Sequence, residues 1–363
     1  MRNKIILLCC GCLLFLALAE IGVRVFRLAP PVVENLGAYR LVDNPKMVYG
    51  LQPGARLDES LINAQGFKDQ DFIKQKPKNT LRIAMLGDSI TEGMRIPLGQ
   101  TFSDLLEAAL NEQALRRKSP RRYDVMNFGV GGYNLEAEIE LLKTTALAYR
   151  PDVVILNLAP NDNEPVPGLF MWFLAENGLS PKEKARIFSA YFSPRPSWQR
   201  LFVRKFLLKS KLYLLLLDRL SRLNVQARRL RRLEKYHLGQ STDVQMWGRE
   251  GFQRQLKELA RLQKVQGFEL LVCLHDFFGP TKARHPNLAA AAAMLEDSGI
   301  RYFFIKDFYL DRVSSLQELV LIPGDYCHLN ALGHRLAAQG LSSELAKHRD
   351  EIFPLRCRNC FQS

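Results

Sequence analysis

Two short stretches carry residues whose types and spacing could perform nucleophilic chemistry. Ser89 stands in "GDSIT" (87–91), directly after an apolar run, and "DYCH" (325–328) contains Asp325 and His328. A carboxylate that orients an imidazole, which in turn accepts a hydroxyl proton, activates serine as a nucleophile. The sequence therefore suggests a Ser-His-Asp triad.

Two further stretches could bring hydrogen-bond donors to the same place. "NFGVGGYN" (127–134) has three glycines in four positions, which let the backbone approach a ligand closely. "LAPNDN" (158–163) presents Asn161, whose side-chain amide could donate a hydrogen bond into the same crevice. The glycine spacing does not match G-x-G-x-x-G, which argues against a dinucleotide-binding loop.

Each stretch also has an ordinary structural interpretation. Serine, asparagine and aspartate commonly cap helices or form turns, and glycines commonly connect strands to helices. The chemical interpretation gains weight from position, because three stretches follow predicted strands and the fourth precedes the last predicted helix. Functional groups gather at the carboxyl ends of parallel strands.

The apolar pattern predicts alternating strands and helices from residue 81 onward. Continuous apolar runs indicate buried strands, and apolar residues at a helical period indicate helices. The predicted strands are 81–86, 123–128, 152–158, 268–274 and 301–305, and the predicted helices are 101–117, 134–149, 248–266, 287–299 and 331–348. This alternation predicts a three-layer α/β/α sandwich around a parallel sheet of about five strands, with a helical insertion.

Taken together, the four stretches resemble the sequence blocks of the SGNH/GDSL hydrolase family. "GDSIT", "NFGVGG", "APND" and "DYCH" stand in the family's order, although Ala159 occupies a position where the third block usually has glycine. The resemblance covers residues 81–165 and 245–348. It implies a flavodoxin-like parallel sheet.

The resemblance also assigns roles to individual residues. Ser89 would be the nucleophile, with Asp325 and His328 completing the triad. The oxyanion hole would consist of the backbone N–H groups of Ser89 and Gly132 with the Asn161 side chain. No metal or nucleotide cofactor is implied, since the triad supplies both nucleophile and base.

The implied activity is that of a serine esterase. We expect it to hydrolyse O-acyl, above all O-acetyl, esters of an envelope glycan or lipid. Two alternatives stay open, which are acyl or acetyl transfer to a polysaccharide and a catalytically silent protein that binds or assembles glycans.

The first 28 residues form a separate segment that is basic at its start and apolar from Ile5 to Ala19. The segment fits a secretory signal cleaved after Ala19, or a helix that continues to Phe26 and anchors the chain in the membrane. We favour the anchor. Both interpretations place the hydrolase domain (81–350) outside the cytoplasm, in the periplasm or at the cell exterior.

Residues 29–80 form a loop-rich lead-in between this segment and the hydrolase domain. Turn signals such as Pro53-Gly54 make the segment rich in loops. "GLQPG" and the later "INAQGFKDQDF" resemble the lead-in of anchored bacterial members of the family, which supports the expected location.

The net charge of +14 comes almost entirely from one segment. Residues 182–235 contain 16 Lys or Arg and 3 Asp or Glu, so the rest of the chain is close to neutral. This basic insertion (180–240) fits a solvated helical lid, a surface for anionic lipid, or a surface for an acidic polymer. Nucleic acid is not an expected partner, because the inferred location is extracytoplasmic.

The cysteines outside the N-terminal segment lie in different predicted parts of the chain. Cys273 falls in a predicted core strand, where a thiol acts as a small apolar side chain. Cys357 and Cys360, in a C-terminal tail (351–363), fit a local disulfide better than a metal site. Cys327 adjoins His328 without a second base, so we do not expect it to be the nucleophile.

Overall fold

The structure is a computed structural model of the 363-residue chain. It describes residues 2–26, 28, 38–42, 44, 46–47, 49–160, 162, 210–212, 215–216, 249–278, 284–322, 325 and 327–348. Asn161, Cys357 and Cys360 lie outside these residues, as does the basic insertion apart from 210–212 and 215–216.

The chain divides into two compact units. The first consists of Met1–Leu36 and Phe170–Val244, and the second of Gly37–Leu169 and Gln245–Ser363. The lead-in from residue 37 onward therefore belongs to the same unit as the predicted hydrolase domain without its basic insertion, which falls in the first unit.

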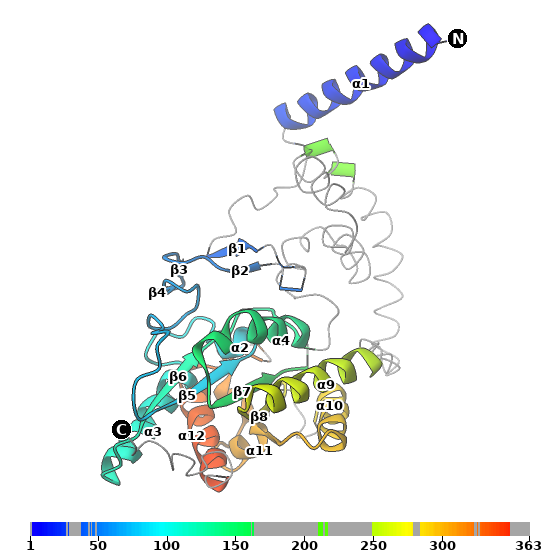
Figure 1. Ribbon diagram of the computed structural model, residues 1–363. Helices are drawn as coiled ribbons and strands as arrows, with labels where there is room; N and C mark the ends of the chain where they lie inside the picture. The colour runs from blue at the N-terminus through cyan, green and yellow to red at the C-terminus, as the bar shows by residue number, and fades with distance from the viewer. Residues whose placement is uncertain are drawn as a thin grey trace. The chain divides into compact units, whose positions relative to one another are not determined.

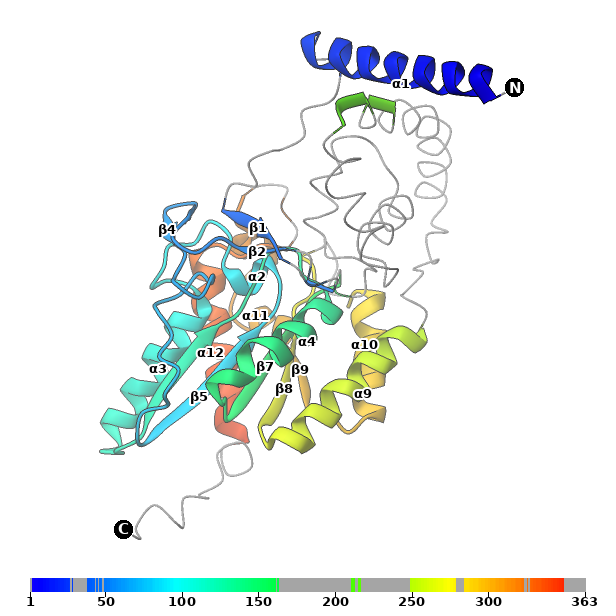
Figure 2. The ribbon, with the colours of Figure 1, turned by 45° about the horizontal axis from the view of Figure 1, so that its top comes forward.

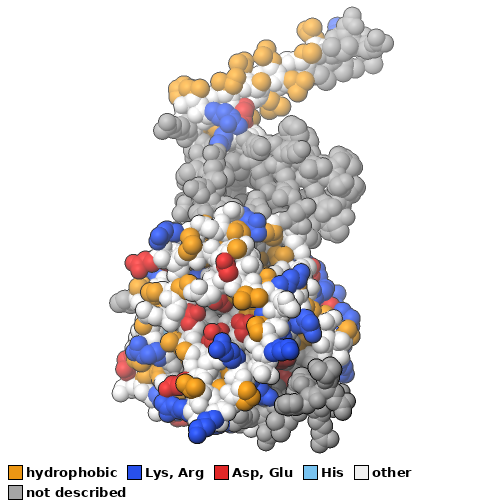
Figure 3. All heavy atoms as spheres, turned by 60° about the vertical axis from the view of Figure 1, so that its left-hand side comes forward, with side chains coloured by type: hydrophobic (Ala, Val, Ile, Leu, Met, Phe, Trp, Pro, Cys, Tyr) orange, Lys and Arg blue, Asp and Glu red, His pale blue; other side chains and the backbone are white. Residues whose placement is uncertain are grey.

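The first unit contains helix α1 (Arg2–Val25). Arg24 Nε lies 2.7 Å from Glu20 Oε1, and the same carboxylate accepts hydrogen bonds from the backbone N–H groups of Lys211 and Leu212. Large hydrophobic side chains are exposed along α1 (Figure 3). Among the described residues, no helix combines the length and apolar character needed to cross a bilayer, so the expected membrane span gains no support there.

The second unit is built on a parallel five-stranded sheet in the order β6-β5-β7-β8-β9 (Figure 1). The strands are β5 (Thr80–Leu86), β6 (Arg122–Asn127), β7 (Val153–Leu158), β8 (Glu269–Leu274) and β9 (Tyr302–Phe304). Met85 lies opposite both Asn127 and Ile155, which sets β5 between its two neighbours. Because the first strand of the sheet lies between the second and the third, the chain has a switch point where ligand sites form.

Helices cover both faces of the sheet (Figure 2). Helices α3 (Phe102–Arg116), α11 (Ile305–Leu310) and α12 (Ala331–Lys347) share one core cluster with the strands, while α4 (Leu135–Thr144) and α9 (Arg249–Gln266) contact each other on the opposite face. All six residues of β7 are buried, as expected for a strand covered on both faces. The predicted three-layer sandwich is confirmed.

The remaining elements are short. Helix α10 (Pro286–Asp297) contacts β9, and two 3-10 helices follow α4 and α11, at Ala146–Tyr149 and Leu316–Leu319.

Figure 3 shows positive and negative side chains interspersed over the visible face of the second unit.

The lead-in forms two small antiparallel hairpins. They are β1 (Tyr39–Leu41) with β2 (Tyr49–Leu51), and β3 (Arg56–Leu57) with β4 (Ser60–Leu61). Beyond them, Asp69 Oδ2 accepts a hydrogen bond from the N–H of Asn127 at 2.7 Å. The lead-in is thereby held against the carboxyl end of β6.

The fully buried Arg82 side chain ties several segments together at the start of the sheet. It donates to the Asp124 carboxylate at 2.9 Å and to the carbonyls of Lys74 and Tyr149 at 3.1 and 2.8 Å. Arg82→Ala should lower the free energy of unfolding by about 3 kcal/mol, because it leaves a cavity and unpaired carbonyls. Urea denaturation measures this.

Arg116→Ala is the matched control. Arg116 also contacts a carboxylate, that of Glu112 at 2.7 Å, but both side chains are exposed. Its removal should change stability by less than about 0.5 kcal/mol. Equal losses for the two variants would contradict the role given to Arg82.

Candidate active site

Ser89 lies just beyond the carboxyl end of β5, after a short turn, and is the first residue of the short helix α2 (Ser89–Glu92). Gly87 adopts φ +155°, and a β-carbon there would lie 2.1 Å from the Thr91 hydroxyl oxygen, so this turn requires glycine. The Asp88 side chain accepts a backbone N–H of the first turn at 2.9 Å and caps α2. Ser89 is half-buried at the mouth of the sheet.

His328 and Asp325 come from the loop that precedes α12. Ser89 Oγ lies 2.9 Å from His328 Nε2, and His328 Nδ1 lies 3.0 Å from Asp325 Oδ2. Just outside these two residues, a backbone bridge pairs Val320 with Leu329 and holds the loop. The structure thus brings the three predicted residues into one hydrogen-bonded chain, although 239 positions separate Ser89 from His328.

The loop itself holds the Asp325 carboxylate. Its Oδ1 accepts the backbone N–H groups of Cys327 and His328 at 3.0 and 3.1 Å. Burial acts to raise the pKa of Asp325, but these hydrogen bonds and the neighbouring imidazole lower it below its usual range overall. An ionised carboxylate only accepts hydrogen bonds, so Nδ1 carries the imidazole proton and Nε2 is left to accept the Ser89 hydroxyl proton.

The glycine-rich stretch follows β6 and lies against α2. A β-carbon on Gly129 would lie 2.3 Å from the backbone nitrogen of Glu92, so only glycine allows this approach. Asn127 joins the two segments, because its Oδ1 accepts the Gly129 N–H at 2.9 Å and its Nδ2 donates to the Thr91 carbonyl at 2.8 Å. Gly132 is half-buried in the turn that follows, with φ +72°.

Asn161 is not among the described residues, but both its neighbours are. The N–H of Asp162 donates to the Ala159 carbonyl at 3.1 Å, and the Asp162 carboxylate accepts the Ala159 N–H in return. Asn287 Nδ2 donates to the Pro160 carbonyl at 2.9 Å. Ala159, which replaces the usual glycine of this block, is buried and its side chain belongs to the core.

Sequence reasoning missed two buried ionisable side chains, Glu92 at the end of α2 and Lys68 from the lead-in. Glu92 Oε2 accepts the N–H of Gly131 at 2.7 Å and the Tyr39 hydroxyl at 3.1 Å, while Lys68 donates to the Gly93 carbonyl at 2.7 Å. Burial raises the pKa of Glu92 to about 7, against the opposing effects of the Gly131 hydrogen bond and the Lys68 charge. The sole sequence signal for Glu92 was its place in the same helical turn as Ser89.

Burial keeps two further titratable side chains, those of Cys327 and His334, uncharged. Cys327 Sγ lies 3.5 Å from His328 Nδ1, but burial and nearby carboxylates raise the pKa of its thiol. A protonated thiol is a poor nucleophile. Burial lowers the pKa of His334 to about 3, and its Nδ1 accepts the Phe102 N–H at 2.9 Å, which is a structural role.

One group of side chains within the described ranges has ligand atoms close enough to hold a metal ion. It consists of Asp325, Cys327 and His328, whose atoms lie within 4.8 Å of one another. Two of the three already take part in the hydrogen-bonded chain to Ser89. A metal ion there would therefore compete with that chain.

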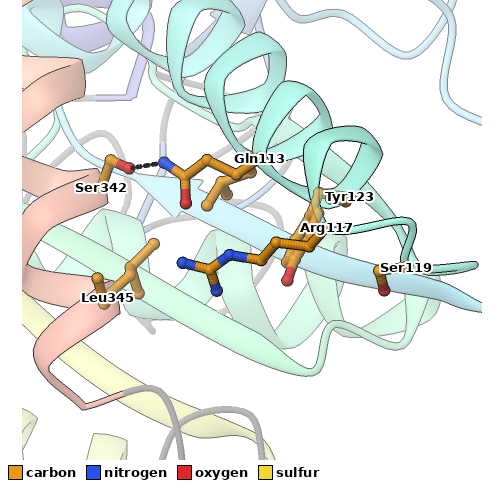
Figure 4. Close-up of a pocket in the computed structure, with 9 residues that line it drawn as sticks. Gln113, Arg117, Ser119, Tyr123, Ser342 and Leu345 are labelled. Carbon is orange, nitrogen blue, oxygen red and sulfur yellow. Dashed lines mark hydrogen bonds between the residues drawn. The ribbon is translucent and has the colours of Figure 1, made fainter.

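A separate hollow of about 90 Å³ lies between α3 and α12 (Figure 4). Gln113 donates to Ser342 at 3.1 Å across it, and the Arg117 side chain extends into it. Tyr123, which also lines it, stands at the start of β6, whereas Ser89 follows the end of β5. The hollow therefore lies at the amino ends of the parallel strands, whereas the Ser89 site lies at their carboxyl ends.

The GDSL-like Lipase/Acylhydrolase family model matches residues 85–336, a range that includes all four blocks. The chain belongs to this family. As a GDSL-family protein it is a carboxylic-ester hydrolase, which confirms the enzyme class expected from the sequence.

Several solved structures are similar to this GDSL-family chain. An acetyl xylan esterase, AlAXEase, shares 14% identity, with 73% of this chain and 100% of that chain covered and a TM-score of 0.40. TesA shares 12% identity, with 73% of this chain and 98% of that chain covered and a TM-score of 0.39. A catalytic mutant of an acetylxylan esterase from Geobacillus stearothermophilus shares 11% identity, with 75% of this chain and 96% of that chain covered and a TM-score of 0.40. None of the curated proteins compared with the chain matches it.

The buried Glu92 carboxyl should make stability depend on pH. Its native pKa of about 7 lies above the ordinary value of 4.5, so its contribution to stability is full below pH 4.5 and is lost as pH rises through 7. Relative to Glu92→Gln, the wild type should lose up to about 1.4 kcal/mol per pH unit in this window. Urea unfolding at pH 5 to 8 measures the difference.

Glu112→Gln, which changes an exposed glutamate in the same way, is the control. It should track the wild type at every pH. If the Glu92→Gln and wild-type curves stay parallel, Glu92 is already ionised throughout, held so by Lys68 and Tyr39 against burial and the repulsion of Asp58.

Proposed function

We propose that this GDSL-family hydrolase is a serine esterase in which Ser89 is the nucleophile, His328 the general base and Asp325 the residue that orients the imidazole. One observation carries the proposal, which is the unbroken chain from Ser89 Oγ through His328 to the Asp325 carboxylate. A serine hydroxyl is a weak nucleophile alone, and an adjacent base oriented by a third group activates it.

Acylation begins when Ser89 Oγ attacks the ester carbonyl carbon while His328 Nε2 takes the hydroxyl proton. The carbonyl oxygen becomes an oxyanion, which the N–H groups of Ser89 and Gly132 and the Asn161 amide are proposed to stabilise. The tetrahedral intermediate collapses, the carbon–oxygen bond to the alcohol breaks, and the imidazolium returns its proton to the leaving alcohol. Asp325 stabilises the imidazolium throughout.

Deacylation repeats these steps with water. His328 takes a proton from water, the hydroxide attacks the acyl-serine, and the carboxylic acid leaves as Ser89 recovers its proton. A sugar hydroxyl in place of water would give acyl transfer by the same steps. The intact Ser89–His328–Asp325 chain does not favour a catalytically silent protein.

The substrate is proposed from the inferred location rather than from side chains at the site. An apolar, basic-ended N-terminal segment is typical of exported proteins, and an extracytoplasmic esterase would meet O-acetylated envelope glycans and lipids. We therefore propose an O-acetyl ester of such a molecule as the substrate. Cell fractionation with a protease-accessibility assay tests the location.

The test of catalysis compares the full chain with Ser89→Ala on p-nitrophenyl acetate and on longer acyl esters. Ser89→Ala should lower kcat by at least about 10³-fold, because the nucleophile is removed while the fold is retained. A preference for acetate over longer chains would support an acetylesterase. A serine-reactive fluorophosphonate should label the wild type alone.

Ser119→Ala is the control serine, since Ser119 lines the distant hollow in Figure 4. It should keep wild-type activity. Turnover by Ser89→Ala at the wild-type rate would overturn the proposed mechanism. Fluorophosphonate labelling of the wild type without turnover of simple esters would instead indicate a selective acceptor or a specific glycan substrate.

A further inference from the structure

We propose that Tyr49 and Glu92 are positioning residues for the oxyanion turn. Tyr49 sets the orientation of the Gly131–Gly132 peptide, and with it the direction of the Gly132 N–H, while Glu92 anchors Gly131 through the preceding peptide. The inference rests on the proposed function, in which that N–H is an oxyanion donor. It makes the lead-in hairpin a working part of the active site, although the family match begins only at residue 85.

The peptide in question is the central peptide of a β-turn. Tyr133 N–H donates to the Val130 carbonyl at 3.1 Å, which closes a four-residue turn with Gly131 and Gly132 at its centre. The φ of +72° at Gly132 is the value expected at the third position of a type II turn. Type I and type II turns differ mainly in which way this central peptide faces.

Two adjacent glycines leave that choice open. Without β-carbons, Gly131 and Gly132 can adopt the backbone angles of either turn type at little cost. A flip would replace the Gly132 N–H with the Gly131 carbonyl oxygen, and an oxygen facing the oxyanion would repel it. Contacts from outside the turn must therefore select one orientation.

Tyr49 provides the first such contact. Its hydroxyl donates to the Gly131 carbonyl at 2.9 Å. In a planar trans peptide the C=O and N–H point in opposite directions, so holding the Gly131 carbonyl toward Tyr49 directs the Gly132 N–H away from it. The hydroxyl thus acts on the oxyanion donor through the peptide plane, without touching the substrate.

The Tyr49 ring is itself fixed. It is fully buried in β2, with the Tyr39 ring 5.9 Å and the Tyr133 ring 5.4 Å from its own centre. The Tyr133 hydroxyl also donates to the Tyr49 carbonyl, so the turn and the hairpin hold each other from both sides. The β1–β2 hairpin lies near α2 in Figure 2, and the Tyr39 hydroxyl of β1 contacts Glu92 of α2 at 3.1 Å.

Glu92 makes a second contact with the turn, from the helix that begins with Ser89. This contact is on the preceding Val130–Gly131 peptide, so it anchors Gly131 while Tyr49 selects the orientation of the next peptide. Its Oε2 accepts the Gly131 N–H at 2.7 Å and the Tyr39 hydroxyl at 3.1 Å. Both polar backbone groups of Gly131 are therefore held by side chains, one from the nucleophile helix and one from the lead-in. The nucleophile and the oxyanion turn are connected through one buried carboxylate.

The test compares Tyr49→Phe with Tyr309→Phe in the full chain, using p-nitrophenyl acetate and with Ser89→Ala in the same assay. Both variants remove one buried hydroxyl, and the Tyr309 hydroxyl has no hydrogen-bond partner among the described residues. Tyr49→Phe should lower kcat by about 10- to 10²-fold and change KM less than about 3-fold, because the loss falls on the oxyanion. Tyr309→Phe should change neither.

The outcomes separate the inference from the proposed function. If Tyr49→Phe keeps kcat within about 2-fold while Ser89→Ala is inactive, the positioning role is wrong and the esterase mechanism stands. If Ser89→Ala stays active, the mechanism fails and the inference fails with it. A rise in KM alone for Tyr49→Phe would also overturn the inference, since it would indicate lost substrate binding.

Tyr133→Phe keeps the inference testable if Tyr49→Phe does not fold. It removes the hydroxyl that donates to the Tyr49 carbonyl and leaves the Tyr49 hydroxyl in place. We expect a smaller fall in kcat with KM unchanged. Urea unfolding shows whether Tyr133→Phe is folded. A folded Tyr133→Phe with the wild-type kcat would contradict the positioning role of Tyr49.

Discussion

The close approach of helix α2 to the ends of β5 and β6 is the constraint on which the rest of the site depends. Gly87 and Gly129 leave no room for a β-carbon on either side of α2. Because Ser89 is the first residue of this helix, any displacement of α2 would move the serine hydroxyl away from His328. Packing of the backbone, rather than side-chain chemistry, sets the geometry in which the chemistry can occur.

The sheet and its main helices could be predicted because buried elements have a recognisable pattern of apolar residues in the sequence. The predicted strand 152–158 corresponds to β7, whose residues are all buried and form one apolar run. Helix α11 was missed because it has only six residues and its first residue, Ile305, continues the apolar run of β9. The lead-in hairpins, with strands of two or three residues, are too short for any periodicity to reveal.

The proposed catalytic residues could be identified in the sequence for a different reason from the residues that support them. Ser89, Asp325 and His328 stand in local patterns with a chemical meaning of their own. Tyr49 acquires its role only from a contact with Gly131, 82 positions away, and a tyrosine in a short apolar stretch is otherwise ordinary core. Lys68 is nearly fully buried. Its burial could not be expected from the sequence, because charged lysine side chains are almost always exposed.

The distance along the chain between Ser89 and His328 has a consequence for biosynthesis. The serine, its capping aspartate and the glycine turn are all translated long before the loop that carries the histidine. Until that loop emerges and docks, the hydroxyl has no base beside it and reacts no faster than any other serine. On the proposed mechanism, the growing polypeptide therefore has no esterase activity until the loop before α12 has docked.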